Sequence, residues 1–398
     1  MKQVCIVITL AVLSVLAACK GGGTAAFNEE EIELRYAKLL TLKQGDGYVA
    51  AEVRDPWDDP SPTLPKGGSR LLHRYILVPR DAEVPTQFSE SSPLGGVRGG
   101  AIIRTPIDRA VVYTSVHTSL FDELGGYDAI KGVCDLEYIY LDKVHRDVKR
   151  GRIVDCGLGI NPDLEKIIDL NPDAILLSPF ENAGSYGKLG KLGIPIIECA
   201  DYMENSALGR AEWMIFYGML IGKEQEARSL FQAVEADYNA TKALVGDVKN
   251  RPTVVTEKKY GSTWYVAGAE STVGGLLRDA GADYIFKDEK TSGSVPMSPE
   301  VVFDRAQQAD IWMFKYNQAI DITSQQLASE WDGYSKMKAF RNANGGVYHC
   351  NLSLVPFYEE TPFHPNLLLK DYVKILHPDV LKDYELRYYK RLTPSPSL

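Results

Sequence analysis

The chain has 398 residues, a length that suffices for two or three domains with sizeable hydrophobic cores. Its composition, 45% hydrophobic and 24% charged, is that of an ordinary globular protein. The formal net charge of -9 argues against a surface for nucleic acid or anionic lipid, because such surfaces need clustered Lys and Arg to neutralise phosphates.

Residues 1–18 predict a lipoprotein signal peptide. The apolar run after Lys2 is too short to span a bilayer, and it ends in the sequence LAAC, which resembles the bacterial lipobox. Cleavage before Cys19 would leave this cysteine to carry the lipid, with Lys20 and three glycines as a flexible tether. A signal peptide in which Cys19 is incidental is the alternative. We expect a periplasmic protein held to a bacterial membrane only by its lipid.

Besides Cys19, four cysteines remain after cleavage, and none has the CxxC spacing of zinc sites: Cys134, Cys156, Cys199 and Cys350. An oxidising compartment permits disulfides, but the sequence does not determine their pairing, and buried free thiols are the alternative. No three-histidine cluster with ligand spacing occurs either. We therefore expect neither a metal centre nor a resident cofactor.

Residues 19–100 are predicted to hold the tether and a small antiparallel β extension. Apolar and polar positions alternate through residues 31–80, and the sequence GDG at 45–47 lies between two such runs. Glycine and aspartate in this position indicate a hairpin turn.

From residue 101 the pattern changes to strands that alternate with helices, which predicts an α/β lobe over residues 101–207 with a mostly parallel sheet. A helix should follow the strand VVYTS, with Thr114, Ser115 or Thr118 as its N-cap. A second helix should open at Asn161, with Pro162 in its first position.

Residues 208–247 predict a linker helix, since their helical periodicity contains no proline and is interrupted at most near Gly222. The strand–helix pattern then restarts in residues 248–398, which form a second lobe with a closing helix and a tail. The order of helix, Asp, apolar strand and polar loop occurs in both halves, in NPDLEKIIDLNPDAILLSPFENAG and in SPEVVFDRAQQADIWMFKYNQ. This recurrence indicates two similar lobes around a shared cleft.

In this order, these segments resemble the helical-backbone class of periplasmic binding proteins over about residues 101–380. This family contains the ABC-transporter substrate-binding lipoproteins for cobalamin, haem and iron-siderophore complexes. The β extension lies outside the common family pattern, although Bacteroidetes lipoproteins look similar there. The resemblance implies an α/β fold of two Rossmann-like lobes joined by a long rigid helix.

Ligand contacts should come from loops at the carboxyl ends of the strands, where α/β sheets leave a crevice. The expected residues of the first lobe are Ser115, His117, Asp135, Tyr138, Phe180, Glu181, Asn182 and Tyr202. Those of the second lobe are Tyr260, Trp264, Ser294, Lys315, Phe357 and Tyr358. Aromatic rings suit a large, flat, partly apolar ligand. A metal-binding role for His117 is one alternative, and a structural hydrogen bond is the other.

The resemblance also implies two docking residues, because family members insert one surface glutamate per lobe into arginine-containing pockets of the permease. The matching positions are Glu165 and Glu300, each in the first turn of an expected helix. A carboxylate there also gains about 0.3–1 kcal/mol from the helix dipole, so simple capping is the alternative.

The function implied by the resemblance is capture of an iron complex, haem or corrinoid and its delivery to an ABC permease with a cytoplasmic ATPase. The chain itself contains no Walker motif. Cobalamin-binding members carry cleft tryptophans that Gly159, Phe180 and Ser294 do not match. The alternatives are an extracytoplasmic tetrapyrrole-processing enzyme, a chelatase or hydrolase, and a ligand-capturing lipoprotein without an importer. No GxSxG, HExxH or CxxC motif supports an enzyme.

Overall fold

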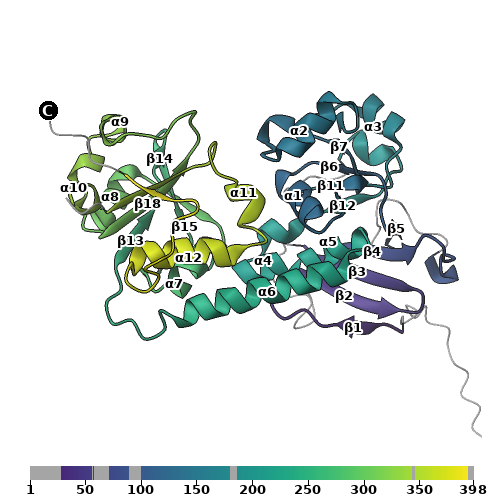
Figure 1. Cartoon of the computed structure of the whole chain (residues 1–398), viewed down its shortest axis with the longest axis horizontal. Helices are drawn as coiled ribbons and strands as arrows, with labels where there is room; N and C mark the ends of the chain where they lie inside the picture. The colour runs from purple at the N-terminus through teal and green to yellow at the C-terminus, as the bar shows by residue number, and fades with distance from the viewer. Residues whose placement is uncertain are drawn as a thin grey trace, which may run out of the picture.

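A computed structural model describes residues 28–55, 57, 71–88, 100–179, 186–342 and 346–392. Figure 1 shows two α/β lobes side by side, with the N-terminal β-sheet below one of them and a long helix passing beneath both. The predicted fold class, two α/β lobes with a small N-terminal β extension, is confirmed, but the long rigid helix expected to join the lobes is divided into three helices. None of the described helices has both the length and the apolarity needed to cross a bilayer.

The N-terminal sheet has five strands in the order β1-β2-β3-β4-β5. They are β1 (Glu30–Ile32), β2 (Leu40–Gly45), β3 (Tyr48–Arg54), β4 (Leu71–Pro79) and β5 (Ala101–Thr105). The predicted hairpin is confirmed, because β2 and β3 pair antiparallel up to Gly45 and Tyr48, and Gly47 in the turn has a φ of 77°. Strand β5 pairs in parallel with β4, so the first residues after position 100 complete this sheet.

The first lobe contains a parallel sheet in the order β12-β11-β6-β7-β8. Its strands are β6 (Ala110–Val112), β7 (Ile130–Val133), β8 (Val154–Asp155), β11 (Ala174–Leu177) and β12 (Ile196–Glu198). Its helices are α1 (Ser115–Glu123), α2 (Asp142–Lys149) and α3 (Leu164–Leu170). Thr114 is the N-cap residue of α1, as one of the three expectations had it.

The predicted start of α3 at Asn161 is wrong. Residues Asn161–Pro162 form β10, which pairs with β9 (Gly157–Leu158) in a short hairpin. The helix begins three residues later because the carboxylate of Asp163 accepts a hydrogen bond from the backbone N–H of Lys166 at 3.2 Å and so caps it.

The second lobe contains a five-stranded sheet in the order β16-β13-β18-β19-β20, parallel except for β20 at its edge. Its strands are β13 (Thr253–Thr256), β16 (Asp283–Tyr284), β18 (Ile311–Tyr316), β19 (Val347–Asn351) and β20 (Lys390–Arg391). A second, antiparallel sheet contains β14 (Lys259–Tyr260), β15 (Thr263–Ala267) and β17 (Ser294–Met297).

Six helices cover this lobe: α7 (Thr272–Asp279), α8 (Pro299–Ala306), α9 (Ser324–Glu330), α10 (Lys338–Arg341), α11 (Phe357–Glu360) and α12 (Pro365–Leu376). Short 3-10 helices complete the described chain: η1 (Thr86–Phe88), η2 (Tyr127–Ala129), η3 (Leu136–Tyr138), η4 (Leu189–Lys191), η5 (Ala200–Met203) and η6 (Tyr334–Lys336).

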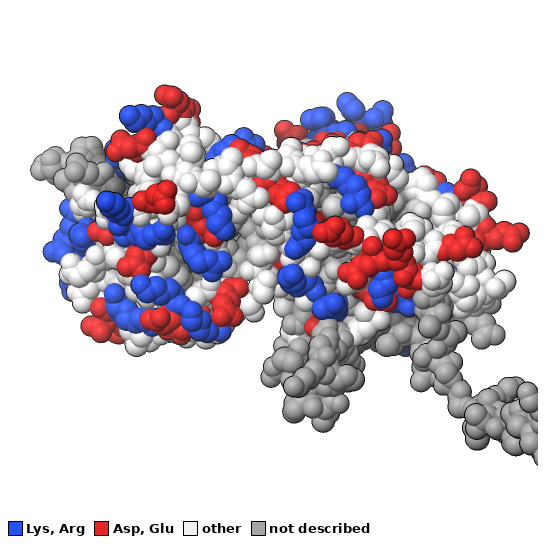
Figure 2. Space-filling view, turned by 90° about the horizontal axis from the view of Figure 1, so that it is seen from below, with Lys and Arg blue, Asp and Glu red and all other residues white. Residues whose placement is uncertain are grey.

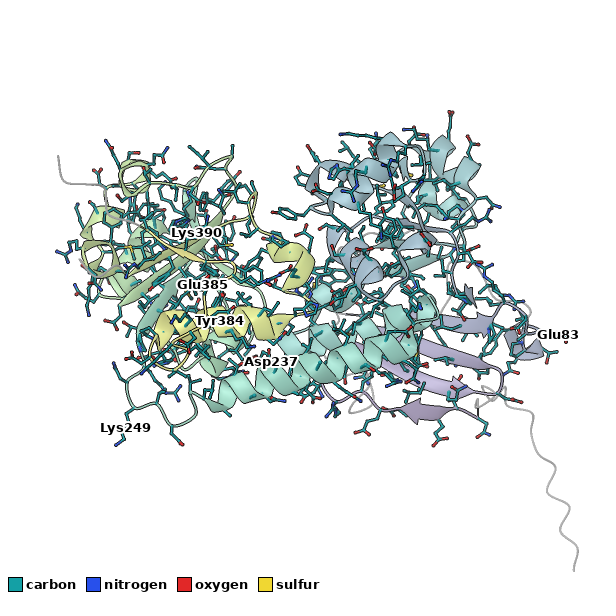
Figure 3. The ribbon with its side chains drawn as sticks, viewed as in Figure 1. Glu83, Asp237, Lys249, Tyr384, Glu385 and Lys390 are labelled. Atoms are coloured by element: carbon teal, nitrogen blue, oxygen red, sulfur yellow. The ribbon has the colours of Figure 1, made fainter. Side chains whose placement is uncertain are left out.

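The predicted linker helix consists of three helices, α4 (Ala207–Glu212), α5 (Met214–Leu220) and α6 (Glu224–Ala243). The chain reverses at Gly222, whose φ of 68° favours glycine, so that α5 and α6 pack against each other. Helix α6 has 20 residues and is about 30 Å long. It contacts the second lobe through Asp237, labelled in Figure 3, which accepts hydrogen bonds from Asn366 of α12 at 2.6 Å and Lys370 at 2.7 Å.

Two buried carboxylates attach the N-terminal part to these linker helices. Glu212 accepts hydrogen bonds from the backbone N–H groups of Arg35, Tyr36 and Ala37 at 2.7 to 2.8 Å. Glu204 accepts from the next two N–H groups, each at 2.8 Å. We call residues 35–39 the strap. Because Tyr36 packs against the hydrophobic cores of both lobes, the strap lies at their junction.

Candidate functional site

Each lobe contains a cavity at the carboxyl ends of its strands, where the sequence predicts ligand contacts. The cavity of the second lobe measures about 760 Å³ and is lined by β14, the end of β18, and helices α11 and α12. The cavity of the first lobe measures about 660 Å³ and is lined by the ends of β6, β7 and β11 and by the β9–β10 hairpin. We call them the C-cavity and the N-cavity.

The structure brings together in the C-cavity five of the residues predicted from the second lobe: Tyr260, Ser294, Lys315, Phe357 and Tyr358. Among the lining residues that the sequence analysis missed are Arg210, Lys258, Lys259 and Tyr265. The two lysines come two and three residues after the end of strand β13. The expectation that ligand contacts follow the carboxyl ends of strands could therefore have found them. Arg210 lies within α4, and nothing in its helical surroundings distinguishes it from a solvated residue.

Cationic side chains outnumber carboxylates in the lining of the C-cavity, although Lys258, Lys315 and Arg210 each pair with a carboxylate, those of Glu330, Glu257 and Asp201. The described lining contains four cationic side chains, and Glu257 is the carboxylate among them. Burial disfavours the charged form of Lys315, but its ion pair with Glu257 outweighs burial and raises the pKa. The ammonium group of Lys259 donates to the backbone oxygen of Gly261 at 3.0 Å and pairs with no carboxylate of the described chain. The cavity therefore suits an anionic ligand in a protein whose net charge is negative.

The N-cavity contains one predicted residue, Asp135. Its φ of 50° lies in the left-handed region, and its carboxylate accepts a hydrogen bond from the N–H of Gly159 at 3.0 Å. A Cβ atom on Gly159 would lie 2.7 Å from that carboxylate, so a side chain there would displace the Asp135 carboxylate. The neighbouring Ile160 is 95% exposed at the tip of the β9–β10 hairpin. The hairpin thus offers an apolar contact that the sequence analysis did not identify.

Two predicted ligand-binding residues are buried in the cores instead. Trp264 is fully buried in β15, where its indole donates to the backbone oxygen of Thr256 at 3.0 Å and its ring packs against Trp312. His117 is 1% exposed on helix α1 and lines no described cavity. Both expectations are corrected, because neither side chain reaches the surface of a cavity.

The remaining predicted residues lie outside the two cavities or outside the described chain. Tyr138 is 70% exposed on η3, and Tyr202 donates to the backbone oxygen of Pro179 at 2.5 Å. Ser115 is the first residue of α1 and lines neither cavity. Phe180, Glu181, Asn182 and the lipidation residue Cys19 lie outside the described residues.

A buried polar network lies behind Arg210. The carboxylate of Asp201 accepts hydrogen bonds from His117 Nε2 at 3.0 Å, from the Tyr217 hydroxyl at 2.8 Å and from Arg210 Nε at 3.1 Å. Burial alone would raise the pKa of Asp201, but these cations and the hydroxyl lower it. Burial would likewise lower the pKa of His117, but the Cys199 sulfur and the Asp201 carboxylate raise it. The network holds the Arg210 side chain at the edge of the C-cavity.

This arrangement predicts a pH dependence of stability. The pKa of His117 is higher in the folded protein than in the unfolded chain, so the protonated imidazole stabilises the fold. This contribution to the free energy of unfolding is fully present below the ordinary imidazole pKa of about 6.5 and is lost as the pH rises through the folded-state value. Relative to His117→Gln, the wild-type free energy of unfolding should therefore fall by up to about 1.4 kcal/mol per pH unit above pH 6.5. Urea denaturation at several pH values measures this difference. Parallel curves for the two proteins would contradict it.

The four cysteines Cys134, Cys156, Cys199 and Cys350 are buried free thiols. Among the described residues, no group of three or more His, Cys, Asp or Glu side chains is placed to hold a metal ion. On the face seen in Figure 2, basic and acidic residues alternate over the described surface without a continuous basic field.

The two expected docking residues occupy equivalent positions. Glu165 is the second residue of α3 and Glu300 the second residue of α8, and both are exposed. Neither carboxylate forms an ion pair with another residue of the described chain. The caps of the two helices are Asp163 and Ser298, which accept hydrogen bonds from backbone N–H groups. Capping therefore does not require either glutamate.

Comparison with known proteins agrees with this architecture. The family model described as periplasmic binding protein matches residues 110–351. An uncharacterized lipoprotein of Methanocaldococcus jannaschii is 28% identical over 79% of this chain and 75% of its own length.

Two solved structures share the fold at low sequence identity. A possible iron-binding, periplasmic solute-binding protein of Staphylococcus epidermidis has a TM-score of 0.53 and 20% identity, covering 68% of this chain and 99% of that one. The molybdate periplasmic binding protein MolA of Haemophilus influenzae has a TM-score of 0.55 and 17% identity, covering 71% and 90%. Since the family model covers more than half of the sequence, the chain belongs to the periplasmic binding protein family.

Proposed function

We propose that the protein is the substrate-binding lipoprotein of an ABC importer and that it captures an anionic metal chelate between its lobes. An iron complex, haem or a corrinoid is the proposed ligand class. The observation that carries this proposal is the C-cavity, because four cations and two exposed or half-exposed tyrosines, Tyr260 and Tyr358, meet there. Cations match the carboxylates of haem and of citrate-type iron chelates, and aromatic rings match the flat faces of a tetrapyrrole or corrin ring.

The proposed attachment and delivery agree with other observations. Cys19 would carry the lipid, and the M. jannaschii relative is itself called a lipoprotein. Glu165 and Glu300 would dock to the permease, since both are exposed and without an ion pair among the described residues. The S. epidermidis protein is named for iron and MolA for molybdate, which shows that similar folds accept metal-containing ligands.

Nothing in the arrangement favours the alternative of a hydrolase. The two nitrogens of His117 face the Thr114 hydroxyl and the Asp201 carboxylate, so they are not available to activate Ser115. A general base must lie within hydrogen-bond reach of the group that it deprotonates. Ser115 and His117 therefore form no nucleophile–base pair.

A ligand panel tests the proposal. The protein without residues 1–19 would be heated with ferric citrate, a ferric siderophore, haemin, cobalamin or cobinamide. A ligand present at 100 times its Kd should stabilise the fold by about 2.7 kcal/mol and raise the Tm. Release of the ligand unchanged after denaturation would support a binding protein, and release of an altered ligand would indicate an enzyme. No shift with any member of the panel would overturn the proposed ligand class.

Lys259→Gln provides a matched test of the C-cavity. Its ammonium group has no carboxylate partner among the described residues, so the exchange should leave the fold intact and weaken the bound chelate by about tenfold. Lys249→Gln is the control, because Lys249 is exposed and distant from the lobes' facing sides, as Figure 3 shows. Titration of both variants with the stabilising panel member measures the effect. Equal affinities would remove Lys259 from the site.

A further inference from the structure

A chain of hydrogen bonds joins the N-terminal sheet to a wall of the N-cavity. Glu198, the last residue of the edge strand β12, has a side chain that is only 5% exposed. Its Oε1 atom lies 2.8 Å from Nε2 of His73 on β4 and accepts a hydrogen bond from the Tyr186 hydroxyl at 2.6 Å. Because Tyr186 lines the N-cavity, one carboxylate oxygen connects the β extension to that cavity.

Strand β4 also holds the backbone of Glu198. The N–H group of Glu198 donates to the hydroxyl oxygen of Tyr75 at 2.8 Å, and Tyr75 is fully buried. The rings of His73 and Tyr75 stack, with centroids 5.9 Å apart and an interplanar angle of 26°. Residues two positions apart in a strand point to the same face, so this face of β4 fixes both the backbone and the carboxylate of Glu198. Figure 1 shows the N-terminal sheet next to β12, below the first lobe.

Tyr186 has a backbone conformation that its surroundings must hold. Its φ of 51° lies in the left-handed region, and Gly187 follows with a φ of 56°. A residue with a side chain is disfavoured there and keeps such a conformation only where neighbouring groups fix it. The backbone oxygen of Tyr186 accepts a hydrogen bond from the N–H of Leu189 at 3.1 Å, which starts the turn into η4. Residues 186–189 line one side of the N-cavity, so the position of Tyr186 determines the shape of this wall.

The lining of the N-cavity is mostly uncharged, in contrast to that of the C-cavity. Its charged side chains among the described residues are those of Asp135 and the exposed Lys188. Tyr113 also lines this cavity, and its buried hydroxyl has no hydrogen-bond partner within the described chain. A phenol hydroxyl can donate to a carbonyl oxygen. The N-cavity therefore suits an uncharged, partly apolar group that carries an oxygen acceptor.

We propose that the N-terminal sheet positions a ligand-contacting wall of the N-cavity and so forms part of the binding site. His73 is the positioning residue, because it lines neither ligand cavity but holds the Glu198 carboxylate, which in turn holds Tyr186. A wall that is fixed in advance does not have to be ordered when the ligand binds. This inference rests on the proposed function, because it takes the N-cavity as the place of the uncharged part of the chelate.

A double-mutant cycle in the ligand-free protein tests the positioning. His73→Ala and Tyr186→Phe are made singly and together, and hydrogen exchange is followed in residues 189–192, whose first amide donates to Tyr186. Each single variant should exchange these amides roughly five- to tenfold faster than wild type. Since both changes act through Glu198, the double variant should exchange no faster than the faster single variant. Independent effects, in which the two accelerations multiply, would overturn the positioning role.

Two controls separate this role from a general loosening of the sheet. His73→Gln keeps an N–H donor for Glu198 and should exchange residues 189–192 as wild type does. Lys43→Gln removes the partly exposed ion pair of β2 with Glu52, at 2.7 Å in the same sheet, and should also leave these amides unchanged. Acceleration by Lys43→Gln equal to that by His73→Ala would contradict the specific path through Glu198.

The ligand itself supplies a separate readout. His73→Ala and Tyr186→Phe should each weaken the stabilising member of the ligand panel by about three- to tenfold, and His73→Gln should restore the affinity. Unchanged affinity in variants with accelerated exchange would show that this wall does not contact the ligand and would overturn the inference. Failure of the proposed function would appear differently, as absent binding of the whole panel by the wild-type protein, and exchange would still decide the positioning.

Discussion

Glu212→Ala is expected to lower the free energy of unfolding by about 3–5 kcal/mol. The side chain is 2% exposed, and its carboxylate is the acceptor for three consecutive N–H groups of the strap, those of Arg35, Tyr36 and Ala37. A buried donor that loses its acceptor costs about 1–3 kcal/mol, and relaxation of the strap makes the three costs less than additive. Urea denaturation followed by circular dichroism measures the change.

Two variants serve as controls for this result. Glu212→Gln keeps one acceptor oxygen and should lose only part of the stability. Glu224→Ala removes a partly exposed ion pair on the neighbouring helix α6 and should change stability by about 0.5 kcal/mol or less. A Glu212→Ala protein as stable as wild type would show that the strap does not support the junction of the lobes.

The lobes and their order could be predicted because strand–helix alternation is a local property of the sequence. The alternation does not determine which side of a strand faces a cavity. In β15, Trp264 is fully buried while its neighbour Tyr265 is 47% exposed and lines the C-cavity. Successive residues of a strand point to opposite faces, so an error of one position exchanges a core residue for a binding residue.

The sequence also did not predict which polar side chains are buried. Glu204 follows η5 and Glu212 ends α4, and in the sequence both resemble ordinary solvated residues, yet both are buried against the strap. Their partners are backbone N–H groups more than 160 positions earlier in the chain. Because every residue except proline has such a group, the residue types do not indicate which positions are partners. The burial of His117 was not predictable for a similar reason, since its partner Asp201 lies 84 positions later in the sequence.

Glu165→Lys combined with Glu300→Lys is expected to abolish uptake of the ligand while its affinity for the isolated protein stays unchanged. Both glutamates are exposed in the first turn of a helix, one in each lobe, and the structure places neither in a cavity. Charge reversal would replace attraction to cationic pockets of the permease by repulsion, at a cost of several kcal/mol. Uptake of labelled chelate and binding by titration measure the two effects separately.

The control pair is Glu83→Lys with Glu385→Lys, which changes the net charge by the same amount at two exposed positions, one in the N-terminal part and one in the second lobe (Figure 3). This pair should transport as wild type does. Each single reversal at Glu165 or Glu300 should retain part of the uptake, because the other lobe still docks, and the residual uptake should weaken further at high ionic strength. Full uptake by the double reversal would show that the two glutamates do not dock. Loss of binding together with uptake would instead locate the defect in the cleft.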